Sequence, residues 1–560
     1  MRAQAYSDGL SVRAIVGTHV VLFGFDVPAD KVGDLMGFTL KRTDVASGKS
    51  FYLDNFLVFA ANDAGANTNH SSAKNPFQEF VWGDYTLQPG HQYSYDVFAM
   101  YGVPGTLQSR AQATITFTSE DEDDGKQGVF FNRGVAGSQA YARHFKQYAK
   151  NGKPPKPADV GAPAYAWLSR GLAEGVEAFI GQASGPRFAL RAAVYEFEYE
   201  PALEYFKAAA DRGADVQIVY DSVDNATRKQ PVPYPRDAND QAIGDVGLAH
   251  CIRRTRTKIA HNKFIVLLVD DVPTAVWTGS TNFTEGGLYG QWNVGHSLRD
   301  KALAKSYFKF WQELASDPPP SAARDWNGAK TPVPATVAKG VTPIFSPRRG
   351  LGALNWYAKL MDESQGAVFL TAAFGVSKEL TAIFEEAKPY LRYLLLDKRQ
   401  GDVTTIARNA ANRITAGGYL GPKNSPFANW MEEALTGFDT HVQYVHTKFM
   451  LIDPLSDDPT VITGSANFSE PSTTANDENM LVIRGDTRLA DIYLGEFMRL
   501  FTHFRFRAKT KTPTTKPAPG PGVATKKTLY LDETDKWARR FFVKNAPRTR
   551  ERELFRAPPQ

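Results

Sequence analysis

Hydrophobic and polar residues alternate in short stretches through the first 118 residues, and turn-rich segments separate these stretches. Val12–Val16, His19–Phe25 and Phe51–Phe59 are examples. A two-residue alternation predicts β-strands that have one face in a core and the other in water. Residues 1–118 are therefore predicted to form an all-β domain.

The segment Leu87–Gly102 makes that prediction more specific. Its Pro-Gly turn leads into a strand that starts near Tyr93. The segment resembles the tyrosine-corner region of fibronectin type III and immunoglobulin-like sandwiches, in which a Tyr just inside a strand ties back the preceding turn. The resemblance implies a β-sandwich over residues 1–118. The acidic run Glu120–Asp124 lacks the alternating ligand spacing of a calcium loop, so residues 119–127 are predicted to be a solvated linker.

Beyond residue 128 the pattern changes, because apolar runs there alternate with helical stretches. A strand-like run at Leu190–Phe197 is followed by a helix that Pro201 opens and by a second strand at Val216–Tyr220. The same order of strand, helix and strand recurs between Val368 and Leu396. Such alternation is typical of an α/β fold in which helices cover a sheet.

Two segments of this region share one motif with identical internal spacing. The first contains His261, Lys263 and Gly279-Ser280-x-Asn282, and the second contains His446, Lys448 and Gly464-Ser465-x-Asn467. One constant offset along the chain relates every position of the second copy to its counterpart in the first. A duplicated motif with fixed spacing indicates segments that fold alike. We therefore predict two pseudo-symmetric α/β halves, over residues 128–330 and 331–508, that pack about a pseudo-two-fold axis.

The residue types in the motif favour phosphodiester chemistry. On a strand, residues two apart point to the same face, so each His projects beside its Lys. Two lysines would neutralise phosphoryl oxygens, while the Ser and Asn side chains would donate hydrogen bonds to them. One imidazole would attack phosphorus and the other would protonate the leaving oxygen and then activate water. The residues assigned to this site are His261, Lys263, Ser280, Asn282, His446, Lys448, Ser465 and Asn467.

The twice-occurring H-x-K and G-S-x-N pattern resembles the phospholipase D superfamily, the HKD phosphodiesterases, over roughly residues 128–508. That resemblance implies a phosphohistidine intermediate, no metal or cofactor, and an active site between two like halves within one chain. Carried over to this chain, His261 would be the nucleophile and His446 the general acid. The sequence itself leaves open which His has which role.

Two departures from perfect repetition bear on the site. The family's supporting Asp is matched by Asp453, whereas the equivalent position of the first copy is Leu268. Further along the second copy stands Glu478, and Asn293 occupies the equivalent position of the first. The family implies that such a Glu orients a catalytic His, and we expect Glu478 to orient His446. Asn293 is assigned to substrate binding.

Two basic features have alternative interpretations. Arg133 follows a strand-like segment and is assigned as a contact to the substrate phosphate, with a buried strand end as the alternative. Four basic residues lead toward His261, either as the entrance for an anionic substrate or as the solvated part of a strand; they are Arg253, Arg254, Arg256 and Lys258.

Charge is concentrated at the end of the chain. Residues 501–560 contain 15 Lys and Arg against 5 Asp and Glu, so the other 500 residues contribute −5 to the net charge of +5. Residues 509–560 are predicted to be a basic linker, Thr510–Lys527, followed by a tail that docks through Trp537, Phe541 and Phe542. A basic segment on a slightly acidic body suits contact with nucleic acid or an anionic membrane surface.

The cysteine count and the distribution of apolar residues bear on the cellular compartment. The single cysteine, Cys251, excludes an intrachain disulfide and a cysteine-based zinc cluster. The N-terminal residues do not resemble a signal peptide, and no apolar run approaches the length of a membrane span. We predict a cytoplasmic protein that acts as a monomer, with export by another route left open.

Three functions remain in competition. The first is a phospholipase D-type hydrolase of phospholipids. The second is a nuclease of the same superfamily, favoured by the run Glu478–Ile483 and by the basic tail. The third is a catalytically inactive binding protein that recognises its partner through the N-terminal sandwich. Cardiolipin synthesis is disfavoured, since those enzymes are usually membrane-anchored.

Overall fold

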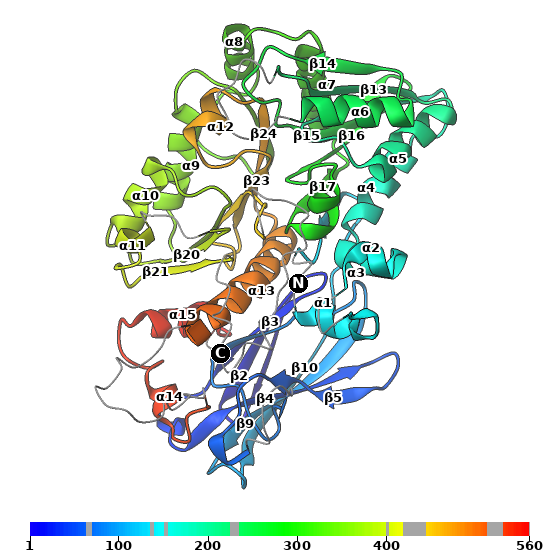
Figure 1. The fold of residues 1–560 in the computed structure, drawn as a ribbon. Coiled ribbons are helices and arrows are strands. Elements are labelled where there is room, and N and C mark those ends of the chain that lie inside the picture. The colour runs from blue at the N-terminus through cyan, green and yellow to red at the C-terminus, as the bar shows by residue number, and fades with distance from the viewer. Residues whose placement is uncertain are drawn as a thin grey trace, which may run out of the picture.

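Figure 1 shows the arrangement of the chain in a computed structural model, with β-strands of the N-terminal part below two α/β halves. The structure describes residues 1–62, 70–134, 139–150, 155–224, 235–398, 403–417, 444–511 and 530–558. Most of the predicted extended linker, Thr510–Lys527, lies outside the described residues.

The N-terminal part contains two four-stranded antiparallel sheets, in the orders β1-β2-β3-β8 and β10-β9-β4-β5. The bounds of the first are β1 (Arg2–Ser7), β2 (Leu10–Val16), β3 (Val21–Asp26) and β8 (Val81–Asp84), and those of the second are β4 (Leu35–Asp44), β5 (Ser50–Tyr52), β9 (Gln92–Tyr101) and β10 (Gln108–Thr118). A separate two-stranded sheet pairs β6 (Asp54–Asn55) with β7 (His70–Ser71).

The two larger N-terminal sheets face each other across one core. The ring of Phe23 on β3 lies 4.8 Å from that of Tyr95 on β9, which lies 5.5 Å from Phe117 on β10. Alternate residues of β9 are buried, as the two-residue pattern predicts. The Tyr93 hydroxyl accepts a hydrogen bond from the N–H of Gln88 at 3.0 Å and so ties back the preceding turn. The fibronectin type III or immunoglobulin-like character of this part remains a prediction.

Each α/β half contains a seven-stranded mixed sheet, and the two sheets have the same strand order. The first is β11-β17-β16-β15-β12-β13-β14, and the second is β18-β24-β23-β22-β19-β20-β21. In each, three neighbouring strands are parallel and the others are antiparallel. This correspondence confirms the α/β fold of two like halves that the repeat predicts.

The elements of the two halves have the following bounds. In the first half they are β11 (Gln127–Phe131), α1 (Gln139–His144), α2 (Pro157–Val160), α3 (Ala162–Ser169), α4 (Leu172–Gly181), β12 (Phe188–Val194), α5 (Glu200–Asp211), β13 (Asp215–Asp221), α6 (Arg236–Val246), β14 (Cys251–Arg254), β15 (Lys263–Val269), β16 (Val272–Gly279), β17 (Val294–Leu298), α7 (Lys301–Ala315) and α8 (Pro320–Lys330). In the second they are β18 (Gly340–Ser346), α9 (Gly352–Asp362), β19 (Ala367–Ala372), α10 (Lys378–Glu385), β20 (Leu391–Leu396), α11 (Val403–Ile406), β21 (Asn412–Ala416), β22 (Phe449–Ile452), β23 (Thr460–Gly464), α12 (Glu470–Thr474), β24 (Glu478–Arg484) and α13 (Thr487–Lys511).

One apolar core joins the halves. It includes Phe264 on β15 and Phe369 on β19 together with Phe310 on α7 and Phe497 on α13. Helix α7 starts where the Asp300 carboxylate accepts backbone N–H groups of its first turn, and its apolar side then faces this core. Each sheet has a second core on its other face. The two sheets are therefore held in a fixed relation by shared packing.

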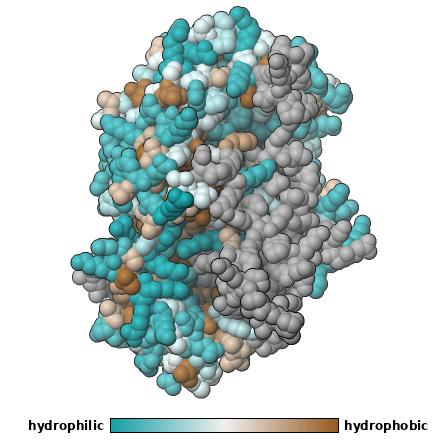
Figure 2. All heavy atoms as spheres, turned by 60° about the vertical axis from the view of Figure 1, so that its left-hand side comes forward, coloured by the Kyte–Doolittle hydropathy of each residue, from teal (hydrophilic) through white to brown (hydrophobic). Residues whose placement is uncertain are grey.

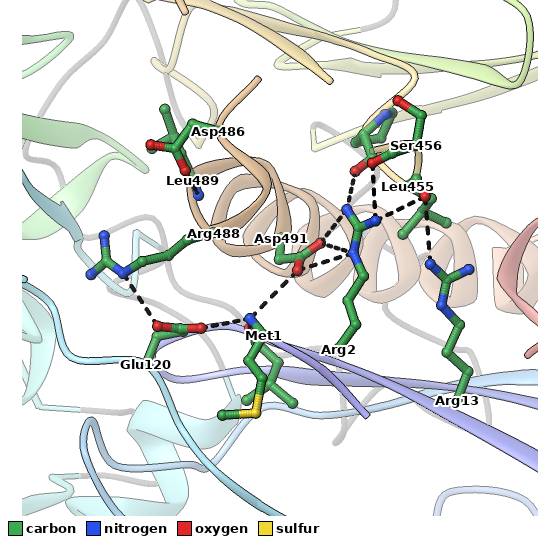
Figure 3. Close-up of polar contacts among 12 residues, drawn as sticks. Met1, Arg2, Arg13, Glu120, Leu455, Ser456, Asp486, Arg488, Leu489 and Asp491 are labelled. Atoms are coloured by element: carbon green, nitrogen blue, oxygen red, sulfur yellow. Dashed lines mark hydrogen bonds and ion pairs between the residues drawn. The ribbon is translucent and has the colours of Figure 1, made fainter. Parts of the chain in front are cut away.

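The N-terminal strands are attached to the second half (Figure 3). Arg2 on β1 pairs with Asp491 on α13 at 2.9 Å, and its guanidinium also donates to the carbonyl of Leu455 at 2.9 Å. The acidic run is not a simple solvated linker, because Glu120 pairs with Arg488 of α13 at 3.2 Å. Ion pairs across these boundaries fix the N-terminal sheets against α13.

The C-terminal tail packs against the N-terminal sheets. It contains α14 (Lys536–Arg539) and α15 (Pro547–Phe555). Trp537 and Phe541 are buried in the core of the N-terminal sheets, and Phe542 packs against it partly buried. The Trp537 indole N–H donates to the carbonyl of Leu35 at 2.7 Å.

We expect Trp537→Ala to lower the free energy of unfolding by about 3–5 kcal/mol, because it leaves a cavity and removes an indole hydrogen bond. Urea denaturation followed by circular dichroism measures the change. Val543→Ala, at an exposed position of the same tail, is the matched control. Equal stability of the two variants would contradict a docking role for Trp537.

In the described part of the chain, no helix combines the length and apolarity that crossing a membrane requires. On the face shown in Figure 2, hydrophobic residues are scattered among hydrophilic ones over the coloured surface.

Candidate active site

The two H-x-K motifs lie at corresponding places in the two sheets. Lys263 is the first residue of β15, and Lys448 directly precedes β22. The Gly-Ser-x-Asn motifs follow the next strand in each half, at the ends of β16 and β23. Identical topology therefore gives each half the same set of side chains at the same sheet edge.

The halves meet through short backbone pairings beside these motifs. Ala260 bridges Asp477, and Trp292 bridges Val445. The Trp292 N–H donates to the carbonyl of Tyr444 at 2.7 Å. Ala260 precedes His261 and Asp477 precedes Glu478, so the first bridge brings His261 beside Glu478. In the same way the second bridge brings His446 beside Asn293. Each motif His therefore lies against the opposite half.

These backbone pairings between the halves decide which residue orients which histidine. His261 Nδ1 lies 2.8 Å from a carboxylate oxygen of Glu478, and His446 Nδ1 lies 3.0 Å from the amide oxygen of Asn293. The expectation that Glu478 orients His446 is therefore wrong. Asn293, assigned to substrate binding, instead lies on the Nδ1 side of His446. Both acceptors place the proton on Nδ1 and leave Nε2 for chemistry.

The serine hydroxyls do not occupy the role expected of them. Ser280 donates to the amide oxygen of Asn293 at 2.8 Å, and Ser465 donates to the Glu478 carboxylate at 2.7 Å. Each also accepts a backbone N–H. Their hydrogen bonds hold the residues that orient the histidines, so direct donation to a phosphoryl group was the wrong expectation.

The two lysines are buried close enough to affect each other. Each ammonium donates to the carbonyl of the motif His, at 2.8 Å for Lys263 and 2.5 Å for Lys448. Burial lowers the pKa of Lys263 to about 8, against the opposing effect of Glu478. Burial and the charge of Lys263 hold the pKa of Lys448 well below its ordinary value. A phosphodiester anion would relieve this repulsion.

The two asparagines differ in their surroundings. The Asn282 amide donates to the Glu196 carboxylate. In the second half, the sheet register places Phe374 where the first half has Glu196, and this Phe is 52% exposed. The amide oxygens of both Asn282 and Asn467 are buried and have no hydrogen-bond partner among the described residues. The two halves therefore differ at this position, where the carboxylate of the first half corresponds to a phenyl ring in the second.

The two histidines share one electrostatic environment but have different partners. Burial, and then the charges of the two lysines, hold the pKa values of both His261 and His446 well below their ordinary value. Burial raises the pKa of Glu478 to about 7. When ionised, this carboxylate increases the electron density on His261, whereas the neutral amide of Asn293 does so much less for His446.

Asp453 lies away from this constellation. Its carboxylate accepts the backbone N–H groups of Gln365 at 2.9 Å and Gly366 at 2.6 Å, ahead of β19. The Asp453 N–H also donates to the carbonyl of Ala367 at 2.9 Å, and at the corresponding place in the first half the Asp270 N–H donates to the carbonyl of Arg187 at 2.7 Å. The contacts of Asp453 support a structural role at the far end of the strand.

Two carboxylates near the motifs were missed by the sequence reasoning. Asp221 accepts the N–H of Ala260 at 2.7 Å, and Asp397 accepts those of Tyr444 at 2.7 Å and Val445 at 2.9 Å. They hold the backbone just before each motif His. Both also favour the charged forms of the nearby lysines. In the sequence, both could have been recognised as an Asp at the end of an apolar strand, one in each half.

The basic residues singled out in the sequence lie in different parts of the structure. Arg254 is fully buried and pairs with Asp477 at 2.9 Å and with Asp317 at 2.6 Å, so it fixes the residue before Glu478. The other three members of that cluster are exposed. Arg133 lies outside the paired-histidine site and lines a different cavity. In the described residues no group of three or more His, Cys, Asp or Glu is arranged to hold a metal ion.

The pH dependence of kcat/KM tests the lysine environment. If Lys263 binds an anionic phosphodiester, activity is expected to fall as pH rises through about 8, because the lysine then loses its charge. Lys263→Arg should shift this alkaline limb upward, since a guanidinium stays protonated. Steady-state rates across the alkaline range measure the limb, with exposed Lys258→Arg as the control. A limb that does not move in Lys263→Arg would exclude Lys263 as its source.

Comparison with known proteins agrees with this architecture. A family model described as "Cardiolipin synthase, PLD-like domain" matches residues 178–314 and 394–501. Each matched segment contains one H-x-K and one G-S-x-N motif. No match is found among curated protein sequences.

Several solved structures are similar at low identity. Phosphatidylserine synthase of Haemophilus influenzae Rd KW20 is 12% identical, with a TM-score of 0.40, over 60% of this chain and 84% of that chain. Polyphosphate kinase of Porphyromonas gingivalis is 11% identical, with a TM-score of 0.39, over 66% of this chain and 52% of that chain, so this chain spans about half of that enzyme. Nuc of Salmonella typhimurium, a phospholipase D family member, is 20% identical, with a TM-score of 0.20, over 31% of this chain and 95% of that chain. The family model thus matches one segment in each α/β half, and the two halves share one strand order.

Proposed function

We propose that this chain cleaves phosphodiesters by the phospholipase D mechanism, with His261 as nucleophile and His446 as general acid. The observation that carries the assignment is the unequal pair of partners: a carboxylate for His261 and an amide for His446. A carboxylate stabilises positive charge on the imidazole that forms a bond to phosphorus. An amide leaves His446 the readier proton donor.

The steps follow from these positions. Lys263 and Lys448 neutralise the non-bridging oxygens of the bound phosphodiester. In this step His446 starts as an imidazolium with its second proton on Nε2, a charged form that the bound phosphodiester anion favours. His261 Nε2 attacks phosphorus, the bond to the leaving oxygen breaks, and that oxygen takes the Nε2 proton of His446. Water then gives a proton to His446 and attacks the phosphohistidine, which breaks the P–N bond and regenerates His261. An alcohol in place of water would give transfer instead of hydrolysis.

We propose phospholipids as the principal substrates. The exposed Phe374, at the place where the first half has Glu196, would supply an apolar wall beside the second half-site. Because both H-x-K motifs come from one chain, a monomer would suffice. Cleavage of DNA or RNA is the alternative that the experiment must distinguish.

The test assays the purified full chain in EDTA against bis-p-nitrophenyl phosphate, phosphatidylcholine vesicles, and single- and double-stranded DNA. His261→Ala and His446→Ala are compared with wild type and with His250→Ala, an exposed histidine away from the motifs. Metal-independent cleavage that only the first two variants lose supports the proposal, and the substrate cleaved identifies the branch. Identical behaviour of all proteins would favour a binding protein.

A further inference from the structure

A cavity separate from the paired histidines lies between the N-terminal sheets and the first α/β half. Its volume is about 600 Å³, within the usual range for small-molecule sites. The N-terminal part contributes His19 and the segment 85–88. The first half contributes Arg133, Ala140, Arg143, His144, Trp167 and Arg170.

The lining of this cavity is electropositive. It includes three arginines and two histidines, and no carboxylate is among the described residues that line it. Behind it, Glu496 pairs with Arg170 at 2.6 Å and with Arg499 at 3.0 Å, so two guanidiniums share this carboxylate. Glu122 lies 2.9 Å from Nε2 of His19. The positive charge of the cavity therefore comes from its arginines.

Arg133 is the residue most in need of a counterion. Its Nε donates to the carbonyl of Trp167 at 2.7 Å, while its terminal nitrogens make no hydrogen bond within the described residues. Arg170 has a buried terminal nitrogen without a partner among those residues. Burial, followed by the charges of Arg170 and Arg499, lowers the pKa of Arg133 to about 9. The site therefore has donors and charge available for an anion.

Trp167 in the cavity does not offer a free stacking surface. The Arg133 guanidinium lies 4.2 Å from the Trp167 ring centroid, and the His144 ring stacks on Trp167 at 5.6 Å. An aromatic base would have to displace one of them. Recognition must come from charge and from the guanidinium geometry, which matches phosphoryl oxygens.

We propose that this cavity is a second, non-catalytic site that binds a phosphoryl dianion, as free phosphate or as the head of a small phosphomonoester. Two guanidiniums with unused donors suit a doubly charged phosphoryl group. The volume leaves room for a small organic body. Because residues of the N-terminal sheets and of the first half line it together, the ligand would bridge the two parts.

Isothermal titration of the full chain with inorganic phosphate tests this site. Phosphate could also bind between the catalytic lysines, so Lys448→Met is titrated in parallel. We expect binding to persist in Lys448→Met and to weaken at least about tenfold in Arg133→Gln. Arg187→Gln, which removes an exposed charge elsewhere, should bind like wild type. Glycerol 3-phosphate distinguishes the sources: tighter binding than phosphate indicates the ester, and equal binding indicates free phosphate.

The site is absent if Arg133→Gln binds like wild type, if Lys448→Met alone abolishes binding, or if millimolar phosphate produces no binding heat. Circular dichroism verifies that Arg133→Gln folds. Should it not fold, exposed Arg143→Gln decides, with about threefold weaker binding expected and unchanged binding overturning the proposal. None of these outcomes depends on whether the chain cleaves phosphodiesters.

Discussion

Replacing either His261 or His446 with alanine is expected to reduce hydrolysis of an unactivated phosphodiester at least about 10⁴-fold. The reason is that His261 accepts the phosphoryl group while His446 supplies the proton to the leaving oxygen in the same step. The two losses should not add in the double variant, since the residues act as a unit. Initial rates in EDTA measure the effect, and exposed His250→Ala is the matched control. Additive losses would mean that the two histidines act independently.

The same variants separate nucleophile from acid. With bis-p-nitrophenyl phosphate the leaving group needs no proton, so His446→Ala should still form the phosphohistidine but hydrolyse it slowly. Acid-quenched mass spectrometry should then find the phosphoryl adduct on His261. His261→Ala should show none. An adduct on His446 would reverse the roles that the unequal partners favour.

Glu478→Gln is expected to lower kcat by about 10²–10⁴-fold, although Glu478 belongs to the opposite half from His261. The substitution keeps the size of the side chain but removes the charge that stabilises the phosphorylated imidazole. Because burial raises the pKa of Glu478 to about 7, activity of the wild type should fall as pH drops through 7, where the carboxylate becomes protonated. The variant should lack this acid limb.

Because Glu478 contacts His261 and Asn293 contacts His446, substitutions at the two positions should affect different steps. Loss of Glu478 should slow phosphorylation even when the leaving group is p-nitrophenolate, because the carboxylate serves the nucleophile. Asn293→Ala should slow only poor leaving groups, and by a smaller factor of about 10–100, because it serves the acid. Exposed Glu470→Gln is the control. An effect of Glu478→Gln confined to poor leaving groups would assign the carboxylate to His446.

Much of the fold could be predicted because it is encoded locally. Alternation at every second residue predicts strands such as β9, and helix signals such as Pro201 predict α5. The constant offset between the two motif copies predicts two halves with one topology, because equal spacing between like residues leaves each motif at the same strand. Same-face projection of His and Lys follows from strand geometry alone.

The partners of these side chains could not be predicted in the same way. Glu478 belongs to the same half of the chain as His446, yet its carboxylate contacts His261 of the other half. Ser280 and Ser465 have the right chemistry for a phosphoryl group, but their hydroxyls are used by Asn293 and Glu478. Hydrogen-bond capacity is a property of the residue, whereas its use depends on what packing brings within about 3 Å.

Tertiary structure also reassigns the basic residues. Arg133 and Arg254 resemble substrate contacts in the sequence, but one lines a separate cavity and the other is paired with Asp477. The sequence by itself determined the two α/β halves, the strand edge that carries each motif, and the residue types of the site. Only the packing of the two sheets on one core decided that each motif His contacts a residue of the opposite half. The physical reason is that periodicity and spacing act within a segment, while contacts between halves depend on how their packed surfaces meet.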